Sequence, residues 1–256
     1  MNILITGGNG YIAKSLILGL GDYNITSITR NDFDLTDRIS TDTWFKEKYF
    51  DVVIHTAVEG GSRLKQDSSS IFYNNLQMFY NLYYNKSHFD KFIYFGSGAE
   101  LENPSDPYGL SKKIINDFIK NEHGFFNIRI FGVFDENELN TRFIKSNIKK
   151  YINKKPIIVH QNKYMDFFYM EDLVKIVREY IIGNAYHSLS KITECSYREK
   201  FTLLDIAYFI NELGTYKVPV KLLDSSKSKD YIGETTPNLS LVGLKKGIQN
   251  VYSKLK

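Results

Sequence analysis

The sequence has a single cysteine, Cys195, among its 256 residues. One cysteine excludes a disulfide within the chain and favours a reducing compartment, and no metal-ligand residues cluster around it, so no metal site is predicted. The sequence also lacks a signal peptide, an apolar run long enough to cross a membrane, and an internal repeat. The net charge is only +4 and the lysines are scattered, which gives no argument for nucleic-acid binding. These absences predict a cytoplasmic protein with neither a membrane nor a nucleic acid as partner.

A glycine-rich segment follows the first strand-like run. Residues 2–6 are rich in β-branched side chains, residues 7–10 read Gly-Gly-Asn-Gly, and apolar residues then recur at helical spacing. Gly7 would allow a tight turn, Gly10 would let the backbone approach a pyrophosphate, and the small Ala13 would let the helix pack closely on the strand. The spacing differs from Gly-x-Gly-x-x-Gly, but the strand and the helix on its two sides favour dinucleotide binding over a plain turn.

Arg30 follows the second predicted strand, residues 25–29. A site for NAD usually has an acidic residue at this point to bind the ribose hydroxyls, whereas the 2′-phosphate of NADP requires a cation. Arg30 therefore predicts NADPH as the cofactor, in preference to a solvated arginine at a strand end.

Two further predicted strands end at small or polar residues. The buried run 51–57 leads to Gly60 and Gly61, which leave room for a ligand, and the run 91–96 leads to Ser97. Ligands bind at the carboxyl ends of the strands in parallel sheets. We therefore expect the Ser97 hydroxyl to lie at a ligand site.

Tyr108 and Lys112 stand four residues apart, directly after Pro107. A helix that begins near Pro107 would place the phenol and the ammonium on one face, one turn apart. A phenol has a pKa of about 10, and lowering it by about 3 units takes roughly 4 kcal/mol of stabilisation from a nearby cation. Tyr108 would then serve as a general acid or base. An isolated Tyr-x-x-x-Lys is more often a surface pair, and it is the glycine turn and Ser97 that favour the catalytic interpretation.

The order of these motifs resembles the extended short-chain dehydrogenases/reductases of the nucleotide-sugar epimerase/dehydratase type. Two later segments agree with this resemblance: residues 127–134 are similar to the strand that lies along the nicotinamide, and residues 166–173 are similar to a late strand-to-helix motif. The resemblance rests further on the Gly7-x-x-Gly10-x-x-Ala13 turn, residues 34–36, Asn75, Ser97 and the Tyr108-x-x-x-Lys112 pair.

The resemblance implies a catalytic set of Ser97, Tyr108 and Lys112. It implies cofactor contacts from Gly7, Asn9, Gly10, Tyr11, Ile12, Arg30, Asp34, Leu35, Ala57, Asn75, Tyr108, Lys112, Phe131 and Val133. It implies substrate contacts from Gly60, Ser97, Gly98, Gly132 and Arg142. Met165 stands where the family often has a phosphate-binding arginine, so we expect Arg142 to take that role.

Within the family, residues 29–37 and the Gly60-Gly61 pair resemble the GDP-fucose synthases, which use NADPH. Those enzymes also epimerise two carbons with a cysteine and a histidine, whose places hold Ala99 and Arg142 in this sequence. Alanine cannot abstract a proton, and Gly98-Ala99 does not supply the acidic pair of the dTDP-glucose dehydratases. We therefore expect hydride and proton transfer at one carbon only.

The predicted fold class is α/β, a Rossmann-type doubly wound parallel sheet with a small C-terminal substrate-binding lobe. We expect a homodimer, as is common in the family. The predicted NADP-binding domain comprises residues 1–135 and about 166–185, and the predicted lobe comprises residues 136–165 and 186–256.

These expectations lead to one function and two alternatives. The resemblance implies an NADPH-dependent reductase of a 4-keto-6-deoxy nucleotide sugar in surface polysaccharide synthesis. A nucleotide-sugar C4 epimerase with bound NAD would use the same three residues, although Arg30 argues against it. The second alternative is a non-catalytic dinucleotide sensor, and the Tyr108–Lys112 pair argues against it because a sensor needs no activated phenol. The sequence leaves the nucleotide, the sugar and the stereochemistry of the product open.

Overall fold

The computed structural model describes residues 1–256 except 62–66, 102–103, 184–189 and 236. The chain divides into two compact units. The first comprises Met1–Arg129 with Val174–Thr193, and the second comprises Ile130–Leu173 with Glu194–Lys256. That such parts serve as a cofactor-binding domain and a substrate-binding lobe stays a prediction.

A six-stranded sheet with the order β2-β1-β3-β4-β5-β9 forms the centre of the first unit. β1 pairs in parallel with β2 and with β3, and β3 pairs in parallel with β4. The strand order reverses at β1, so the carboxyl ends of β1 and β3 flank the point at which ligands bind in such sheets. The strands are β1 (Asn2–Thr6), β2 (Asn24–Ile28), β3 (Phe50–His55), β4 (Phe89–Ser97), β5 (Phe125–Ile130) and β9 (Ile192–Cys195).

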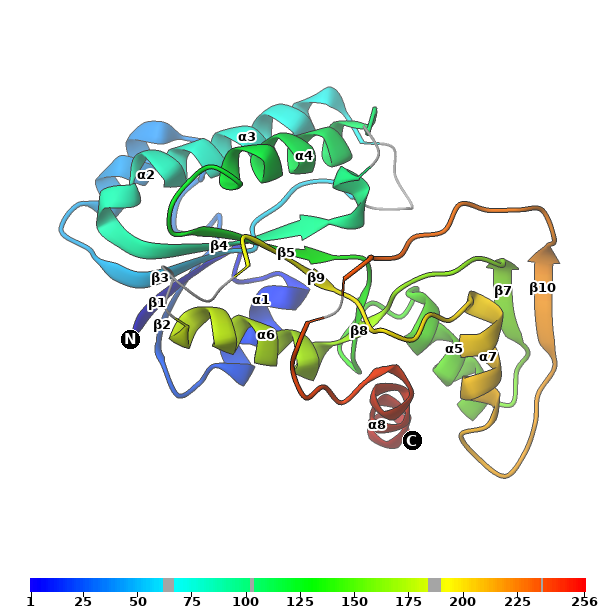
Figure 1. Ribbon diagram of the computed structural model, residues 1–256. Helices are drawn as coiled ribbons and strands as arrows, with labels where there is room; N and C mark the ends of the chain where they lie inside the picture. Colours follow the sequence, from blue (N-terminus) through cyan, green and yellow to red (C-terminus); the bar gives the residue numbers. More distant parts are fainter. Residues whose placement is uncertain (62–66, 102–103, 184–189, 236) are drawn as a thin grey trace. The chain divides into compact units, whose positions relative to one another are not determined.

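Helices cover both faces of this sheet (Figure 1). α2 (Arg38–Phe45), α3 (Ser69–Tyr84) and α4 (Pro107–Ile119) lie on one face, and α1 (Tyr11–Gly19) and α6 (Met170–Ile182) lie on the other. Because both faces are covered, the central strands are apolar along most of their length. The predicted doubly wound parallel sheet is confirmed.

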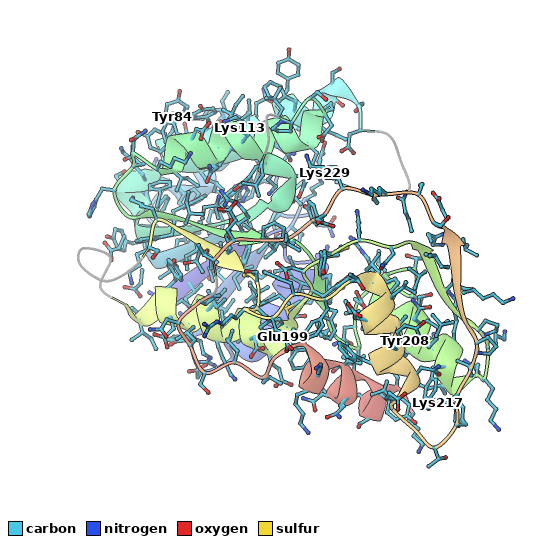
Figure 2. The ribbon with its side chains drawn as sticks, turned by 45° about the vertical axis from the view of Figure 1, so that its right-hand side comes forward. Tyr84, Lys113, Glu199, Tyr208, Lys217 and Lys229 are labelled. Atoms are coloured by element: carbon cyan, nitrogen blue, oxygen red, sulfur yellow. The ribbon has the colours of Figure 1, made fainter. Side chains whose placement is uncertain are left out.

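Aromatic side chains fill the core between the sheet and its α2–α4 layer. The ring centroid of Phe79 on α3 lies 5.8 Å from that of Phe92 on β4 and 5.4 Å from that of Phe118 on α4. Figure 2 shows Tyr84 and Lys113 at the outer surface of the same helical layer, where Tyr84 is exposed. The helical face that carries Phe79 therefore holds α3 and α4 against the sheet.

The second unit contains two small parallel sheets. β7 (Ile157–Gln161) pairs with β10 (Val220–Asp224), and β6 (Val133–Phe134) pairs with β8 (Phe168–Tyr169). A separate hydrophobic core joins these strands to α5 (Phe143–Ile152), α7 (Leu203–Asn211) and α8 (Leu244–Leu255). None of the helices in the described part of either unit is long and apolar enough to cross a membrane.

Candidate active site

The turn after β1 has the geometry of a phosphate-binding loop. Gly7 has φ +68°, and a Cβ at this position would lie 2.8 Å from the Cα of Ala57, so a side chain is excluded both by conformation and by space. The Gly10 N–H donates to the Gly7 carbonyl at 2.8 Å, and Gly10 begins α1 without a side-chain cap. The N-terminus of α1 therefore presents its partial positive charge beside a backbone that a phosphate can approach closely.

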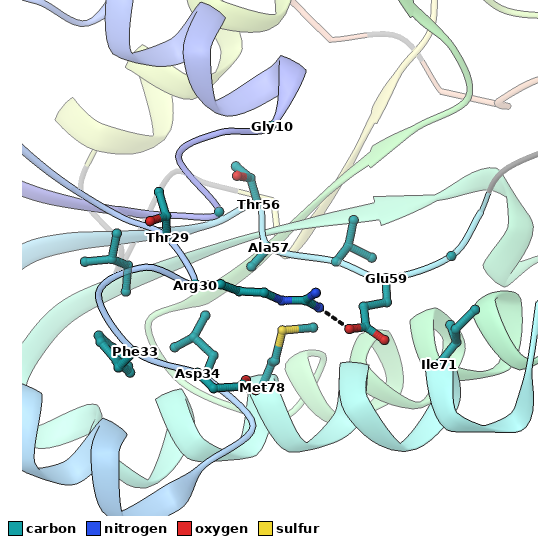
Figure 3. Close-up of a pocket in the computed structure, with 15 residues that line it drawn as sticks. Gly10, Thr29, Arg30, Phe33, Asp34, Thr56, Ala57, Glu59, Ile71 and Met78 are labelled. Carbon is teal, nitrogen blue, oxygen red and sulfur yellow. Dashed lines mark hydrogen bonds and ion pairs between the residues drawn. The ribbon is translucent and has the colours of Figure 1, made fainter.

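A cavity of about 500 Å³ adjoins this turn, entirely within the first unit (Figure 3). Six residues predicted to bind cofactor line it: Gly7, Gly10, Arg30, Asp34, Leu35 and Ala57. Gly60, predicted to contact substrate, also lines the cavity, together with Ile28, Thr29, Phe33, Thr56, Val58, Glu59, Ile71 and Met78. The cavity thus combines the glycine turn, the ends of β2 and β3, and one face of α3.

An ion pair connects Arg30 after β2 with Glu59 after β3 (Figure 3). The second oxygen of the Glu59 carboxylate accepts a hydrogen bond from the Asn74 amide at 2.8 Å. The Arg30 side chain is 70% exposed, whereas the Glu59 side chain is 24% exposed. Glu59 was not predicted as a site residue, because only the glycines of this segment indicate room for a ligand.

Asn75 was predicted to contact cofactor, and the structure shows its amide bonded to protein groups. Its oxygen accepts from the Glu59 N–H at 2.9 Å, and its nitrogen donates to the Glu59 carbonyl at 3.0 Å. The same nitrogen lies 3.2 Å from the hydroxyl of Ser111, one residue before Lys112 on α4. Asn75 therefore connects the backbone of the cavity wall to the helix that carries Tyr108 and Lys112.

Tyr108 lies in the first turn of α4, as its position after Pro107 predicted. Asp106 caps this helix by accepting the Gly109 N–H at 2.7 Å. Gly61 has φ +70°, and a Cβ there would lie 2.8 Å from Cζ of Tyr108. The Tyr108 ring therefore packs against the backbone of Gly61, and the lack of a side chain at Gly61 leaves room for this ring.

Lys112 is buried, with 4% of its surface exposed. Its ammonium donates to the Phe95 carbonyl at 2.6 Å, and it lies 4.4 Å from the ring centroid of Tyr94 and 5.6 Å from that of Tyr108. Burial lowers the pKa of Lys112 to about 8, while the nearby Glu100 carboxylate opposes that fall. The structure thus places the cation beside the phenol, and the catalytic roles of both stay predictions.

Ser97 is the last residue of β4, the position expected for a ligand-facing hydroxyl. Its oxygen accepts the Ala99 N–H at 3.2 Å, and the Glu100 carboxylate accepts the Ser97 N–H at 3.3 Å. These bonds form a capping box around the short helix η2 (Gly98–Glu100), which also holds the predicted substrate contact Gly98. The capping box therefore holds both the backbone N–H and the side-chain oxygen of Ser97.

Glu100, which was not among the predicted site residues, is the centre of a buried polar network. Its carboxylate accepts from the Arg129 guanidinium at 2.6 Å and from the Asn127 amide at 2.9 Å. Burial raises the pKa of the Glu100 carboxyl, and the positive charges of Arg129 and Lys112 oppose that rise. The network links η2 and the Ser97 backbone to β5.

His55 is the last residue of β3. Its imidazole is fully buried and lies 2.8 Å from the Thr6 hydroxyl. Burial, followed by the charge of Lys112, lowers the His55 pKa to about 3. His55 is therefore neutral near neutral pH and is not a source of protons there.

The remaining predicted site residues lie at the start of α1 or in the second unit. Asn9, Tyr11 and Ile12 are at the start of α1, with Asn9 exposed. Phe131, Gly132, Val133 and Arg142 belong to the second unit, where Arg142 precedes α5. Their contacts with cofactor or substrate stay predictions. In the described residues, no group of three or more His, Cys, Asp and Glu side chains could hold a metal ion.

The model of the NAD dependent epimerase/dehydratase family matches residues 3–182, and the chain belongs to this family. Membership confirms the resemblance seen in the motifs, and it makes the chain an oxidoreductase-type enzyme that works with a nicotinamide cofactor. Comparison with curated proteins by sequence gives no match.

Several solved structures share the fold along nearly the whole chain. A UDP-glucose 4-epimerase from Thermotoga maritima has a TM-score of 0.80 at 16% identity, covering 100% of this chain and 98% of that one. A GDP-L-fucose synthetase from Naegleria fowleri bound to NADP has a TM-score of 0.76 at 16% identity, with coverages of 98% and 91%. A GDP-6-OMe-4-keto-L-xylo-heptose reductase from Campylobacter jejuni has a TM-score of 0.75 at 16% identity, with coverages of 99% and 97%. At these identities the likeness shows the fold.

The buried Glu100–Arg129 pair makes a prediction about stability. Arg129→Met would leave the Glu100 carboxylate buried without its guanidinium partner, so the free energy of unfolding should fall by about 3–5 kcal/mol. Urea unfolding followed by Trp44 fluorescence would measure this. Adding Glu100→Gln to Arg129→Met should recover part of the loss. As a control, Arg38→Met breaks an exposed pair with Asp42 and should cost less than about 1 kcal/mol. Equal losses of unfolding free energy in Arg129→Met and Arg38→Met would contradict the conclusion that the Glu100–Arg129 pair is a buried, stabilising pair.

Proposed function

We propose that this protein is an NADPH-dependent reductase of a 4-keto-6-deoxy nucleotide sugar. The observation that carries the proposal is the Tyr108 phenol at the start of α4, with the buried Lys112 ammonium 5.6 Å from its ring centroid. This pair belongs to the same unit as the cavity beside the glycine turn. A phenol beside a fixed cation is suited to exchanging a proton with a carbonyl oxygen.

The residues around the cavity fit a dinucleotide. Gly7 leaves the backbone bare where a Cβ would collide with Ala57, and the uncapped N-terminus of α1 suits a pyrophosphate. Arg30 supplies the cation that a 2′-phosphate requires, which supports NADPH. When bound, the nicotinamide supplies the hydride for the carbonyl carbon.

The residues of the chain would handle the proton and the oxygen. Tyr108 donates its phenolic proton to the carbonyl oxygen, and the Ser97 hydroxyl hydrogen-bonds the same oxygen. Lys112, held by the Phe95 carbonyl, stabilises the phenolate that remains after transfer. Ala99 offers no acid or base, so the proposed chemistry is confined to one carbon. Gly132 and Arg142 keep their predicted roles as substrate contacts in this proposal.

A C4 epimerase that retains NAD is the second candidate, and Glu59 favours it. A carboxylate near the ribose is typical of NAD sites, and Glu59 lines the cavity opposite Arg30. The same Tyr108 and Lys112 would serve an epimerase. Cytoplasmic location, a homodimer and a place in surface polysaccharide synthesis belong to the proposal without bearing on this choice.

The reductase should oxidise NADPH when given its sugar. We expect purified protein, mixed with 4-keto-6-deoxy sugars linked to GDP, dTDP or CDP, to consume NADPH with one nucleotide series and to do so faster than it consumes NADH. The absorbance of the reduced nicotinamide measures both rates. If no sugar of the panel leads to NADPH oxidation and the purified protein retains NAD, the epimerase would replace the reductase as the proposed function.

Tyr108→Phe removes the phenolic proton and keeps the ring that packs on Gly61. NADPH binding should stay near the wild-type affinity while turnover falls by about 100-fold or more, because positioned general acids contribute about 10²–10⁴-fold. Tyr73→Phe, an exposed tyrosine of α3, is the matched control and should leave both quantities unchanged. A Tyr108→Phe enzyme with near-normal turnover would remove Tyr108 from the mechanism.

The pH profile should report Lys112. Because the Lys112 pKa lies at about 8, its charge is present below that pH and is lost above it. Reduction by the wild-type protein should therefore slow as the pH rises through about 8. Lys112→Arg keeps a positive charge at high pH, so the decline should move to higher pH in this variant if it folds. Circular dichroism across the pH range checks folding. An unchanged profile in a folded Lys112→Arg variant would exclude Lys112 as the titrating group.

A further inference from the structure

The cavity beside the glycine turn contains a cation and two carboxylates among its lining residues. The cation is Arg30, and the carboxylates belong to Asp34 and Glu59. One oxygen of Asp34 accepts from the N–H and the hydroxyl of Thr36, each at 2.9 Å, so this group stabilises its own turn. Glu59 instead accepts a hydrogen bond from the Arg30 guanidinium, and the long Arg30 side chain extends toward it (Figure 3).

Glu59 is held in that position at both its backbone and its side chain. The Asn75 amide binds its N–H and its carbonyl, at 2.9 Å and 3.0 Å. The Asn74 amide donates to the carboxylate oxygen that does not face Arg30, at 2.8 Å. Arg30, by contrast, is mostly exposed and carries its charge on a long flexible stem. The carboxylate is therefore held by further hydrogen bonds, whereas the guanidinium belongs to a mostly exposed side chain.

A 2′-phosphate and the Glu59 carboxylate require the same donor groups. A phosphate that binds Arg30 must either displace Glu59 or share the guanidinium with it, and it is repelled by the carboxylate in both cases. A ribose with a free 2′-hydroxyl meets no such repulsion and can donate a hydrogen bond to a carboxylate.

We infer that Glu59 is a specificity-determining residue, which limits the preference for NADPH over NADH by competing with the 2′-phosphate for Arg30. This inference rests on the proposed use of NADPH. The affinity of Arg30 for a 2′-phosphate is then set by a residue in the segment after β3. The protein then retains a measurable affinity for NADH.

Glu59→Gln tests the inference without any sugar substrate. Glutamine keeps an oxygen that can accept from Asn74, but it loses the charge that holds Arg30. The probes are 2′,5′-ADP and 5′-AMP, which differ only in the 2′-phosphate, and titration calorimetry measures both affinities. The variant should bind 2′,5′-ADP about two- to fivefold more tightly, the size expected for an exposed charge pair, and it should bind 5′-AMP no more tightly than the wild-type protein does. NADPH and NADH should show the same change in ratio.

Two comparisons separate a local effect from a general one. Glu179→Gln changes the net charge equally at an exposed position on α6 and should leave both affinities unaltered. In an Arg30→Ala background, the Glu59→Gln gain for 2′,5′-ADP should become smaller, because the competition for Arg30 is lost and only the direct repulsion between carboxylate and phosphate remains. This double-mutant cycle would falsify the inference if the gain stayed complete without Arg30.

The outcomes also separate this inference from the proposed function. If the wild-type protein binds 2′,5′-ADP and the affinity ratio does not change in Glu59→Gln, the inference fails while NADPH use stands. If no variant binds either nucleotide, the inference and the proposed cofactor fail together. If only 5′-AMP binds to the wild-type protein but 2′,5′-ADP binds to Glu59→Gln, the competition stands and the proposed NADPH preference fails.

Discussion

The burial of the Lys112 ammonium is the constraint on which the arrangement of the site depends. A buried cation is costly unless surrounding dipoles and charges compensate it, and Lys112 obtains compensation from the Phe95 carbonyl, the Tyr94 ring and the charge of Glu100. Glu100 is itself buried and requires Arg129 and Asn127 of β5. One charge on α4 thereby fixes β4, β5 and η2 relative to one another, and it fixes Ser97, whose N–H binds Glu100, in the same step.

The site also requires the backbone to pass close to other groups at two places, and a glycine stands at each of them. At Gly7 the chain passes so near Ala57 that a side chain would collide, which leaves the turn open to a phosphate. At Gly61 the Tyr108 ring fills the space where a side chain would be. One segment after β3 thus forms part of the cavity wall and also contacts the Tyr108 ring. Asn75 connects this segment to α4 through Ser111, so one amide joins the cavity wall to the helix that carries Tyr108.

Local sequence patterns made most of the fold predictable. Ion pairs between residues that are far apart in the sequence could not be predicted, and this limited the prediction of the site. The helix expected to begin near Pro107 is found as α4 (Pro107–Ile119), because proline fits the first turn of a helix. β9 was missed, since four residues that include Glu194 have no clear strand pattern. Tyr108 and Lys112 were identifiable because they stand four positions apart on one helix. Glu59 and Glu100 were not, since each pairs with an arginine 29 residues away, and only the folded sheet brings those partners together. Asn75 was identified by its resemblance alone, and its bonds to Glu59 and Ser111 needed the structure.

The two glutamate–arginine pairs have opposite consequences because they differ in exposure. Arg129 and Glu100 are almost inaccessible to solvent, so each charge depends on the other, and the pair belongs to the architecture. Arg30 is 70% exposed, and an ion pair in such a setting contributes only about 0–1 kcal/mol to folding. Its effect on folding is therefore small, while its effect on an incoming phosphate is direct, since the same guanidinium must serve both anions. The fixed carboxylate of Glu59 thus matters chiefly for what enters the cavity.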